Sequence, residues 1–144
     1  MDFKNKKVLI TGGCSGIGKI MARKSLERGA SNLIIWDINE EGLAKTKEEF
    51  AKFGKEISTY KVDVSNLDEI KIAVQRVRIE VGKVDILINN AGIVVGKYFH
   101  EHTHEHITKS MMINSDAPMH ITLEFLQGMM KENSPKDFAT LISL

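Results

Sequence analysis

The chain of 144 residues is long enough for one domain that buries about two-thirds of the surface its unfolded form exposes. Its formal net charge of +1, with lysines scattered along the chain, gives no electrostatic reason to expect a nucleic-acid partner. A single cysteine excludes an internal disulfide framework, and the apolar run near the N-terminus is too short for a signal peptide or a membrane span. We therefore expect a cytoplasmic protein with no nucleic-acid or membrane partner.

Short apolar runs alternate with amphipathic helical patterns along the chain. Continuously apolar strands separated by such helices are typical of a parallel sheet covered on both faces. The sequence therefore predicts one doubly wound α/β domain over residues 1–144, with a Rossmann-like parallel sheet whose ligands bind beyond the carboxyl ends of the strands. The strands are expected at 8–11, 32–37, 57–64, 84–92 and 138–144, and the helices at about 16–30, 40–54, 66–81 and 103–130.

Polar residues mark the starts of the second and third helices. Asn39 is expected to cap the second helix. Ser65, followed by Asp68 and Glu69, is expected to form a near capping box at the start of the third.

A glycine-rich turn, TGGCSGIG, joins the first strand to the first helix. Gly12, Gly16 and Gly18 follow the spacing G-x-x-x-G-x-G. Glycines allow a tight turn, a close approach of backbone to a diphosphate and close packing of helix on strand. The helix N-terminus adds free N–H groups and the positive end of its dipole, and Ser15 can add a hydroxyl. The alternative is that the glycines serve only the steric needs of the turn.

Asp37 ends the second strand, nineteen residues beyond Gly18. In dinucleotide-binding folds an acid at about this distance binds the ribose hydroxyls. A carboxylate there would repel a 2′-phosphate, and no arginine or lysine lies inside the glycine turn or just after Asp37 to hold one. The sequence therefore favours NAD(H) over NADP(H) as the cofactor. The alternative is that Asp37 is only a turn residue at a strand end.

Later motifs complete a family resemblance. Asp63 and Val64, NNAG at 89–92 and Asn114 in INSDAP follow the glycine turn and Asp37 in the order and spacing of a short-chain dehydrogenase/reductase. The chain resembles the N-terminal, cofactor-binding portion of that family over all 144 residues. The stretches LIIWDINEEGL and ILINNAGIV are also similar to the retinol and hydroxysteroid dehydrogenase branch.

The resemblance implies that the residues of these motifs bind the cofactor. Asp63 would bind the adenine amino group, and Val64 would pack near the ring. Asn90, Ala91 and Gly92 would line the cofactor and steady the central strand. Together with the glycine turn and the acid, the implied cofactor-binding residues are Gly12, Cys14, Ser15, Gly16, Ile17, Gly18, Asp37, Ile38, Asp63, Val64, Asn90, Ala91 and Gly92.

Asn114 is the catalytic residue that the resemblance places in this chain, through a backbone carbonyl that holds a water in a proton relay. Its side chain is expected to face the core, where it needs a partner, because its helical stripe is otherwise apolar. Pro118 lacks the N–H that would bond to the Asn114 carbonyl, which leaves that carbonyl free. A kinked helix with a satisfied core asparagine is the alternative. The stripe consists of Ile107, Met111, Asn114, Pro118, Ile121 and Phe125.

The family's proton-transfer residues are missing from the chain. The resemblance implies a tyrosine, a lysine four residues later that lowers the tyrosine pKa, and a serine that holds the substrate oxygen. Tyr60 is followed at that position by Val64, and Tyr98 by His102. Ser143 falls a few residues before the expected catalytic serine. We therefore expect a sheet truncated after the fifth strand, and no dehydrogenase turnover by these 144 residues alone.

The leading hypothesis is an NAD-dependent oxidoreductase, represented by its N-terminal part, that transfers hydride between nicotinamide and a small-molecule secondary alcohol or ketone. The rival hypothesis is a non-catalytic NAD-binding remnant or an interaction module. In the family the long helix commonly pairs with its copy. The methionine-rich helix 103–130 is therefore the expected surface of any homo-oligomer.

Four of the five histidines lie in HEHTHEH, residues 100–106. His100 with His104, or His102 with His106, could share a helical face and hold zinc. Thr103, however, is a good N-cap, which would leave His100 and His102 outside the helix and split both pairs. We therefore expect no metal site.

Cys14 lies in the glycine turn at a helix N-terminus, a position that can lower a thiol pKa. The motif holds no base that could activate the thiol. We expect Cys14 to be a small filler of the turn rather than a nucleophile.

Overall fold

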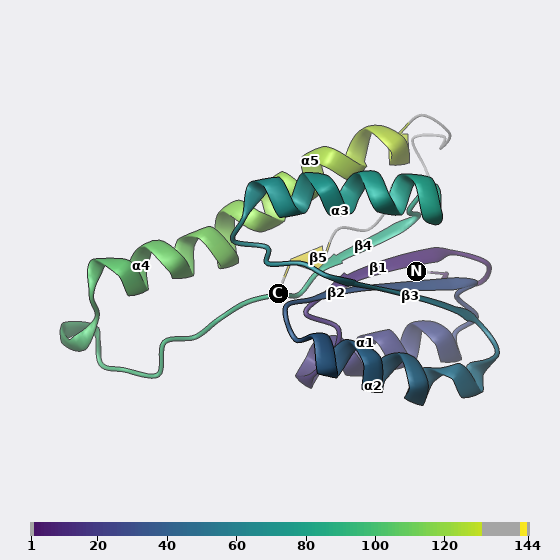
Figure 1. The fold of residues 1–144 in the computed structure, drawn as a ribbon, viewed down its shortest axis with the longest axis horizontal. Coiled ribbons are helices and arrows are strands. Elements are labelled where there is room, and N and C mark those ends of the chain that lie inside the picture. Colours follow the sequence, from purple (N-terminus) through teal and green to yellow (C-terminus); the bar gives the residue numbers. More distant parts are fainter. Residues whose placement is uncertain (1, 131–141, 144) are drawn as a thin grey trace.

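The computed structural model describes residues 2–130 and 142–143. Its five strands run parallel in one sheet, in the order β3-β2-β1-β4-β5. The helices cover both faces of this sheet (Figure 1), so the predicted doubly wound α/β fold is confirmed. The strands are β1 (Lys7–Thr11), β2 (Asn32–Asp37), β3 (Glu56–Lys61), β4 (Ile86–Asn89) and β5 (Ile142–Ser143).

Helices α1 (Gly16–Glu27) and α2 (Glu40–Phe50) pack on one face, and α3 (Leu67–Glu80) and α5 (Ala117–Met130) pack on the other (Figure 1). Successive residues of the central strands point to opposite faces of the sheet. The residues that point to each face must be apolar, because helices cover both faces. Leu9 belongs to the core under α3 and α5, whereas Ile10 belongs to the core under α1 and α2.

The strand order reverses between β1 and β4, which both pair with other strands on their far sides. The crossover helices on the two sides of this point leave a crevice at the carboxyl ends of the strands, where ligands of open α/β sheets bind. Both predicted site-forming loops, the glycine turn and NNAG, leave these two strands. β3 and β4 are shorter than predicted, because residues 62–64 and 90–92 belong to loops at this edge.

The helix starts follow local capping chemistry. Asn39 caps α2 as predicted, accepting a hydrogen bond from the Gly42 N–H at 3.0 Å. The predicted Ser65 cap of α3 is wrong, because Asn66 is the N-cap and accepts hydrogen bonds from two first-turn N–H groups. Ser65 instead donates its hydroxyl proton to the Asp63 carboxylate at 2.6 Å.

The helix predicted at 103–130 is divided by a π-helical turn. α4 (His104–Met111) leads into η3 (Met112–Asp116) and then into α5, and the Ala117 N–H donates to the Met112 carbonyl five residues back. Pro118, which has no N–H, comes directly after this turn. The π-helical turn, with its bond to a carbonyl five residues back, replaces the α-helical bonds that proline cannot make. Such π turns occur frequently at functional sites.

The predicted core-facing stripe of this helix is only partly correct. Ile121 and Phe125 are buried against the sheet, but Ile107 is 39% exposed and Met111 54% exposed, and Asn114 is exposed as well. Figure 1 shows the cause, since α4 reaches beyond the sheet instead of lying over it.

Of the predicted final strand, residues 142–143 form β5 and pair with Ile88 and Asn89, and the rest lies outside the described residues. Within the described residues, no helix has both the length and the apolar character needed to cross a membrane.

Candidate functional site

A pocket of about 490 Å³ lies at the carboxyl ends of β1 to β4. It brings together loops that are far apart in the sequence: the glycine turn, the end of β2, the loop after β3 and the NNAG loop. The predicted residues that line it are Gly12, Ser15, Gly16, Ile17, Asp37, Ile38, Asp63, Val64, Asn90, Ala91 and Gly92.

The glycines of the turn face different surroundings. Gly12 (φ +67°) and Gly16 (φ +50°) adopt left-handed backbone conformations that favour glycine. A Cβ atom on Gly16 would have no other atom within 4 Å, so the backbone at Gly16 is open to the pocket. Gly18 does not line the pocket, because a Cβ there would lie 2.1 Å from the Gly12 carbonyl oxygen. Gly18 therefore lets α1 pack closely on the turn.

The N-terminus of α1 points its first N–H groups toward the same pocket wall. Ser15 is the N-cap, yet its side chain makes no capping hydrogen bond, and the first turn of α1 holds no acidic residue. The N–H groups that a cap would normally satisfy are therefore available to an anion, which the helix dipole also favours.

Thr11 and Asn90 join the glycine turn to the NNAG loop. The Thr11 hydroxyl accepts hydrogen bonds from the N–H groups of Asn90 and Ala91, each at 3.0 Å. The Asn90 side-chain amide donates to the carbonyls of Thr11 at 3.0 Å and Gly12 at 3.1 Å. The expectation that Asn90 steadies the central strand agrees with these bonds. Thr11 was assigned no role from the sequence, although a polar residue ending an apolar strand was a usable signal.

Asp37 is held in place by backbone donors. Its Oδ2 accepts the Cys14 N–H at 3.1 Å, and its Oδ1 accepts the Asn39 N–H at 3.0 Å. Each carboxylate oxygen has a second lone pair, so the group can still accept hydrogen bonds from a ligand. The Asp37 carboxylate therefore stands as a fixed negative charge at the pocket wall.

Asp63 is fixed through one oxygen. Its Oδ1 accepts both the N–H and the hydroxyl proton of Ser65, at 2.9 Å and 2.6 Å, and its own N–H donates to Glu69 at 2.8 Å. These bonds leave Oδ2 available to a donor in the pocket. Val64, which is 9% exposed, belongs to the core on the α3 side.

Asn114 ties the π turn to the loop after β4. Its Oδ1 accepts the Ile93 N–H at 2.9 Å and its Nδ2 donates to the Ile93 carbonyl at 2.9 Å. The side chain thus finds its partners at the surface of the NNAG loop, not in the core as predicted. Asn114 does not line the pocket itself, but Ile113 and Ile93 on either side of this clamp do.

Several pocket residues carry no motif and were missed from the sequence. Trp36, Ile93, Lys109 and Ile113 all line the pocket. Lys109 and Ile113 come from α4 and η3, and only the fold brings that segment to the sheet edge. Trp36 precedes Asp37 in β2, where a large residue at the strand end was the available signal.

Cys14 lies under the turn and does not line the pocket. It is 8% exposed and packs in the core between the sheet and the α1–α2 layer. Burial and the neighbouring Asp37 carboxylate raise the pKa of its thiol from 9.0 to about 12. Desolvation outweighs any lowering of the pKa by the helix N-terminus, and the packing agrees with the predicted filler role.

The sequence matches a family described as short chain dehydrogenase over residues 6–136. The chain belongs to the short-chain dehydrogenase family. The resemblance predicted from the glycine turn, NNAG and Asn114 is therefore confirmed.

The relatives of this chain include human Short-chain dehydrogenase/reductase 3, 37% identical over 130 residues, or 90% of this chain and 43% of that protein. They also include 3beta-hydroxysteroid dehydrogenase 2 of Eggerthella lenta, 49% identical over 86 residues, or 60% of this chain and 33% of that protein. Such relatives confirm the predicted similarity to the retinol and hydroxysteroid branch. The chain spans less than half the length of these curated relatives.

Solved structures agree with this assignment. A short-chain dehydrogenase/reductase from Burkholderia phymatum in complex with NAD has a TM-score of 0.87 at 28% identity, over 98% of this chain and 49% of that chain. L-sorbose reductase from Gluconobacter frateurii, complexed with NADPH and L-sorbose, has a TM-score of 0.82 at 27% identity, over 90% of this chain and 50% of that chain. The family therefore includes structures with either nicotinamide cofactor.

Neither Tyr60 nor Tyr98 lines the pocket. Tyr60 is 3% exposed and donates its hydroxyl proton to Glu80 at 2.9 Å. Burial and this carboxylate raise the pKa of Tyr60, so almost none of its base form, the phenolate, exists at neutral pH. Tyr98 is 76% exposed in the loop before α4.

The histidine segment is only partly as predicted. Thr103 caps α4, and its hydroxyl accepts the His106 N–H at 3.3 Å while His106 Nδ1 accepts the Thr103 N–H at 3.2 Å. The cap does not separate His102 from His106, whose rings meet edge to face at 5.9 Å. No group of three or more histidine, cysteine or acidic residues among those described could hold a metal ion.

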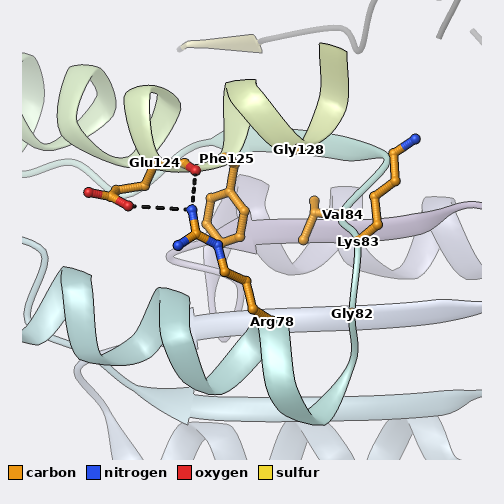
Figure 2. A pocket seen from close by; sticks show the side chains of 7 residues that line it. All are labelled: Arg78, Gly82, Lys83, Val84, Glu124, Phe125 and Gly128. Carbon is orange, nitrogen blue, oxygen red and sulfur yellow. Dashed lines mark hydrogen bonds and ion pairs between the residues drawn. The ribbon is translucent and has the colours of Figure 1, made fainter. Parts of the chain in front are cut away.

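A second pocket, of about 340 Å³, lies between α3 and α5 (Figure 2). Arg78 closes one side by donating to the Glu124 carbonyl at 2.6 Å, and Phe125 packs beside it. Val84, which lies just before β4, lines this pocket. The pocket is therefore at the amino ends of the strands. It contains none of the predicted site residues.

Proposed function

We propose that this chain provides the NAD-binding portion of an oxidoreductase that transfers hydride between nicotinamide and a secondary alcohol or ketone. The observation that carries the proposal is the single pocket in which the glycine turn, Asp37, Asp63 and the NNAG loop meet. These loops leave four different strands, so their meeting is a property of the fold and not of any one motif.

The residues of the pocket fit a dinucleotide. The open backbone at Gly16 and the free N–H groups of α1 would receive the diphosphate. The fixed carboxylate of Asp37 would accept hydrogen bonds from the hydroxyls of the adenosine ribose, and the free Oδ2 of Asp63 would accept a hydrogen bond from the adenine amino group. Asn90, Ala91 and Gly92 would line the path between the two halves of the cofactor. Bound NAD supplies the hydride acceptor and NADH the donor.

Asn114 would serve the reaction through its backbone. Its side chain is already bonded to Ile93 in both directions, so it has little left to offer a substrate. Pro118 can donate to neither the Asn114 carbonyl, four residues back, nor the Ile113 carbonyl, five residues back. The Asn114 carbonyl thus lacks the donor that an α-helix would supply, which supports a role in holding a water that passes a proton.

The preference for NAD over NADP rests on the Asp37 charge, which would repel a 2′-phosphate. Paired titrations with NADH and NADPH test it. We expect the wild-type chain to bind NADH at least about tenfold more tightly, and we expect Asp37→Ser to narrow that ratio. Equal affinity of the wild-type chain for the two cofactors would contradict the preference.

A non-catalytic NAD-binding module is the second candidate function. It is favoured by one sequence observation, that neither Tyr60 nor Tyr98 is followed by a lysine at the fourth position. Assays of the 16.1 kDa chain with NAD and a panel of secondary alcohols should show binding without turnover. Sustained NADH production by the pure chain would contradict this expectation.

A homo-oligomer would use an exposed face of the π turn and α5. We call this face the outer stripe; its residues recur every three, four or seven positions and lie away from the buried side of α5. A second copy of the chain is the proposed occupant. The outer stripe consists of Met112, Met119, Leu123, Leu126 and Met130.

We also propose a cytoplasmic setting, which the single cysteine favours.

A further inference from the structure

The charges of the main pocket are unbalanced for the ligand it is proposed to hold. Two of its lining residues are acidic, Asp37 and Asp63, and one is basic, Lys109. The diphosphate of a dinucleotide brings two further negative charges. Both carboxylates oppose its binding through space, so the position of the single ammonium matters more than it would in a neutral site.

Lys109 stands on the side of α4 that faces this pocket. It lies in the last turn of α4, one helical turn before Ile113, and residues four apart share a helix face. Ile113 is 7% exposed and lines the same pocket. Lys109 itself is exposed, so its long side chain extends from the pocket wall beside the buried Ile113 and keeps its ammonium in solvent.

The Lys109 ammonium has no competing partner among the described residues. Other lysines near the sheet edge are paired, such as Lys61 with Glu40 at 3.1 Å and Lys19 with Glu49 at 2.7 Å. Lys109 makes no such contact within the part of the chain that the structure describes. A flexible, unpaired cation at the rim of an acidic pocket is suited to an anionic ligand.

The clamp between Asn114 and Ile93 fixes the helix that carries this lysine. Ile93 lines the pocket, and the two hydrogen bonds of 2.9 Å hold the π turn against the NNAG loop. α4 otherwise extends beyond the sheet (Figure 1). This clamp therefore helps to hold the C-terminal end of α4, and with it Lys109, beside the pocket.

We propose that Lys109 is a cofactor-binding residue whose ammonium contacts the phosphate groups of the bound dinucleotide. This inference rests on the proposed NAD-binding function. Lysine binds phosphate as a point charge, without the planar geometry that arginine requires. The diphosphate is common to NAD and NADP, so Lys109 raises affinity for both, whereas Asp37 discriminates between them.

The test is a set of nucleotide titrations of the intact chain, with NMR chemical shifts as the readout. NADH and ADP carry the diphosphate and adenosine does not. We expect Lys109→Met to weaken the binding of NADH and ADP by about fivefold to tenfold and to leave the binding of adenosine unchanged. Lys109→Arg should retain most of the affinity, and raising the salt concentration should weaken wild type more than Lys109→Met.

Lys71→Met is the matched control, because Lys71 is an exposed lysine on α3 that does not line the pocket. Equal NADH and ADP affinities for Lys109→Met and wild type would overturn the role of Lys109 and leave the proposed function standing. A loss for adenosine as large as for ADP would also overturn it, because the effect would not involve phosphate. A wild-type chain that binds none of the three would refute the proposed function itself.

Discussion

The glycines of the turn have different structural roles, although they form one motif in the sequence. Gly18 is required by packing, since an added Cβ would clash with the Gly12 carbonyl and the Asn90 amide, whereas Gly16 is required by backbone conformation at an open wall. Gly13 was overlooked, yet a Cβ there would lie 2.7 Å from the Ile35 Cγ2. Spacing identifies where the turn is, but only the packed structure shows which contact each glycine protects.

Gly18→Ala should destabilise the fold. The added Cβ would meet backbone at 2.1 Å, which cannot move without displacing the turn, so we expect a loss of about 3 kcal/mol in the free energy of unfolding. Urea denaturation measures it. Gly128→Ala is the matched control, because its Cβ meets nothing within 4 Å in α5 and should leave stability equal or slightly raised. Similar stabilities of the two variants would contradict this account of Gly18.

Cys14 should resist alkylation in the folded chain. Its thiol pKa of about 12 leaves almost no thiolate near pH 8, so labelling by iodoacetamide should be far slower than in the urea-unfolded chain. Mass spectrometry follows the rate. Equal rates in the folded and unfolded chains would show that the thiol is neither buried nor raised in pKa.

The same thiol gives stability a pH dependence with a definite sign. The unfolded chain loses this proton near pH 9 while the folded chain keeps it to about pH 12, so the free energy of unfolding falls as pH rises through that window. Cys14→Ala should be free of this part of the alkaline decline. A wild-type decline no steeper than that of Cys14→Ala would contradict the raised pKa.

Elements meet at the site through hydrogen bonds that the sequence does not reveal. β1 and β4 are joined beyond their last ladder bonds by Thr11 and Asn90, and the loop after β4 is joined to the π turn by Ile93 and Asn114. The alternation of apolar strands with helices was enough to predict the layers. It was not enough to predict the π turn, since a stripe at helical spacing looks continuous whether or not one wide turn interrupts it.

Thr11→Val tests the bond between β1 and β4. Valine keeps the shape of threonine but leaves the N–H groups of Asn90 and Ala91 without their acceptor, which should cost about 2 kcal/mol of stability and weaken nucleotide binding. Thr11→Ser keeps the hydroxyl and is the control. Denaturation and NADH titration give the two readouts, and a Thr11→Val chain as stable as Thr11→Ser would contradict the structural role of the hydroxyl.

At the scale of the whole molecule, the outer stripe of the π turn and α5 is an apolar surface that no other described residue covers. Met119 is 64% exposed and Leu123 65% exposed, on the opposite side of the helix from the buried Ile121 and Phe125. The sequence indicated a methionine-rich helix, but the assignment of residues to the buried and outer sides needed the fold. Such a stripe marks a protein-binding face more often than a free surface.

The outer stripe predicts self-association that depends on concentration. Leu123→Gln should weaken it by about tenfold or more, because in a twofold-symmetric contact each substitution acts twice. Sedimentation velocity over a range of concentrations measures the effect. Ile72→Gln is the control, since Ile72 is 61% exposed on α3, outside the stripe. A wild-type chain that stays monomeric at all concentrations would contradict the proposed interface.

The most direct test of the central claim is hydrogen exchange of the chain with and without NADH, read by mass spectrometry. The expected result is protection in four separate segments at once: the glycine turn 12–18, residues 37–38 at the end of β2, the loop 63–64 and the NNAG loop 90–92. Saturating NADH without protection at these segments, or with protection confined to the pocket between α3 and α5, would contradict it.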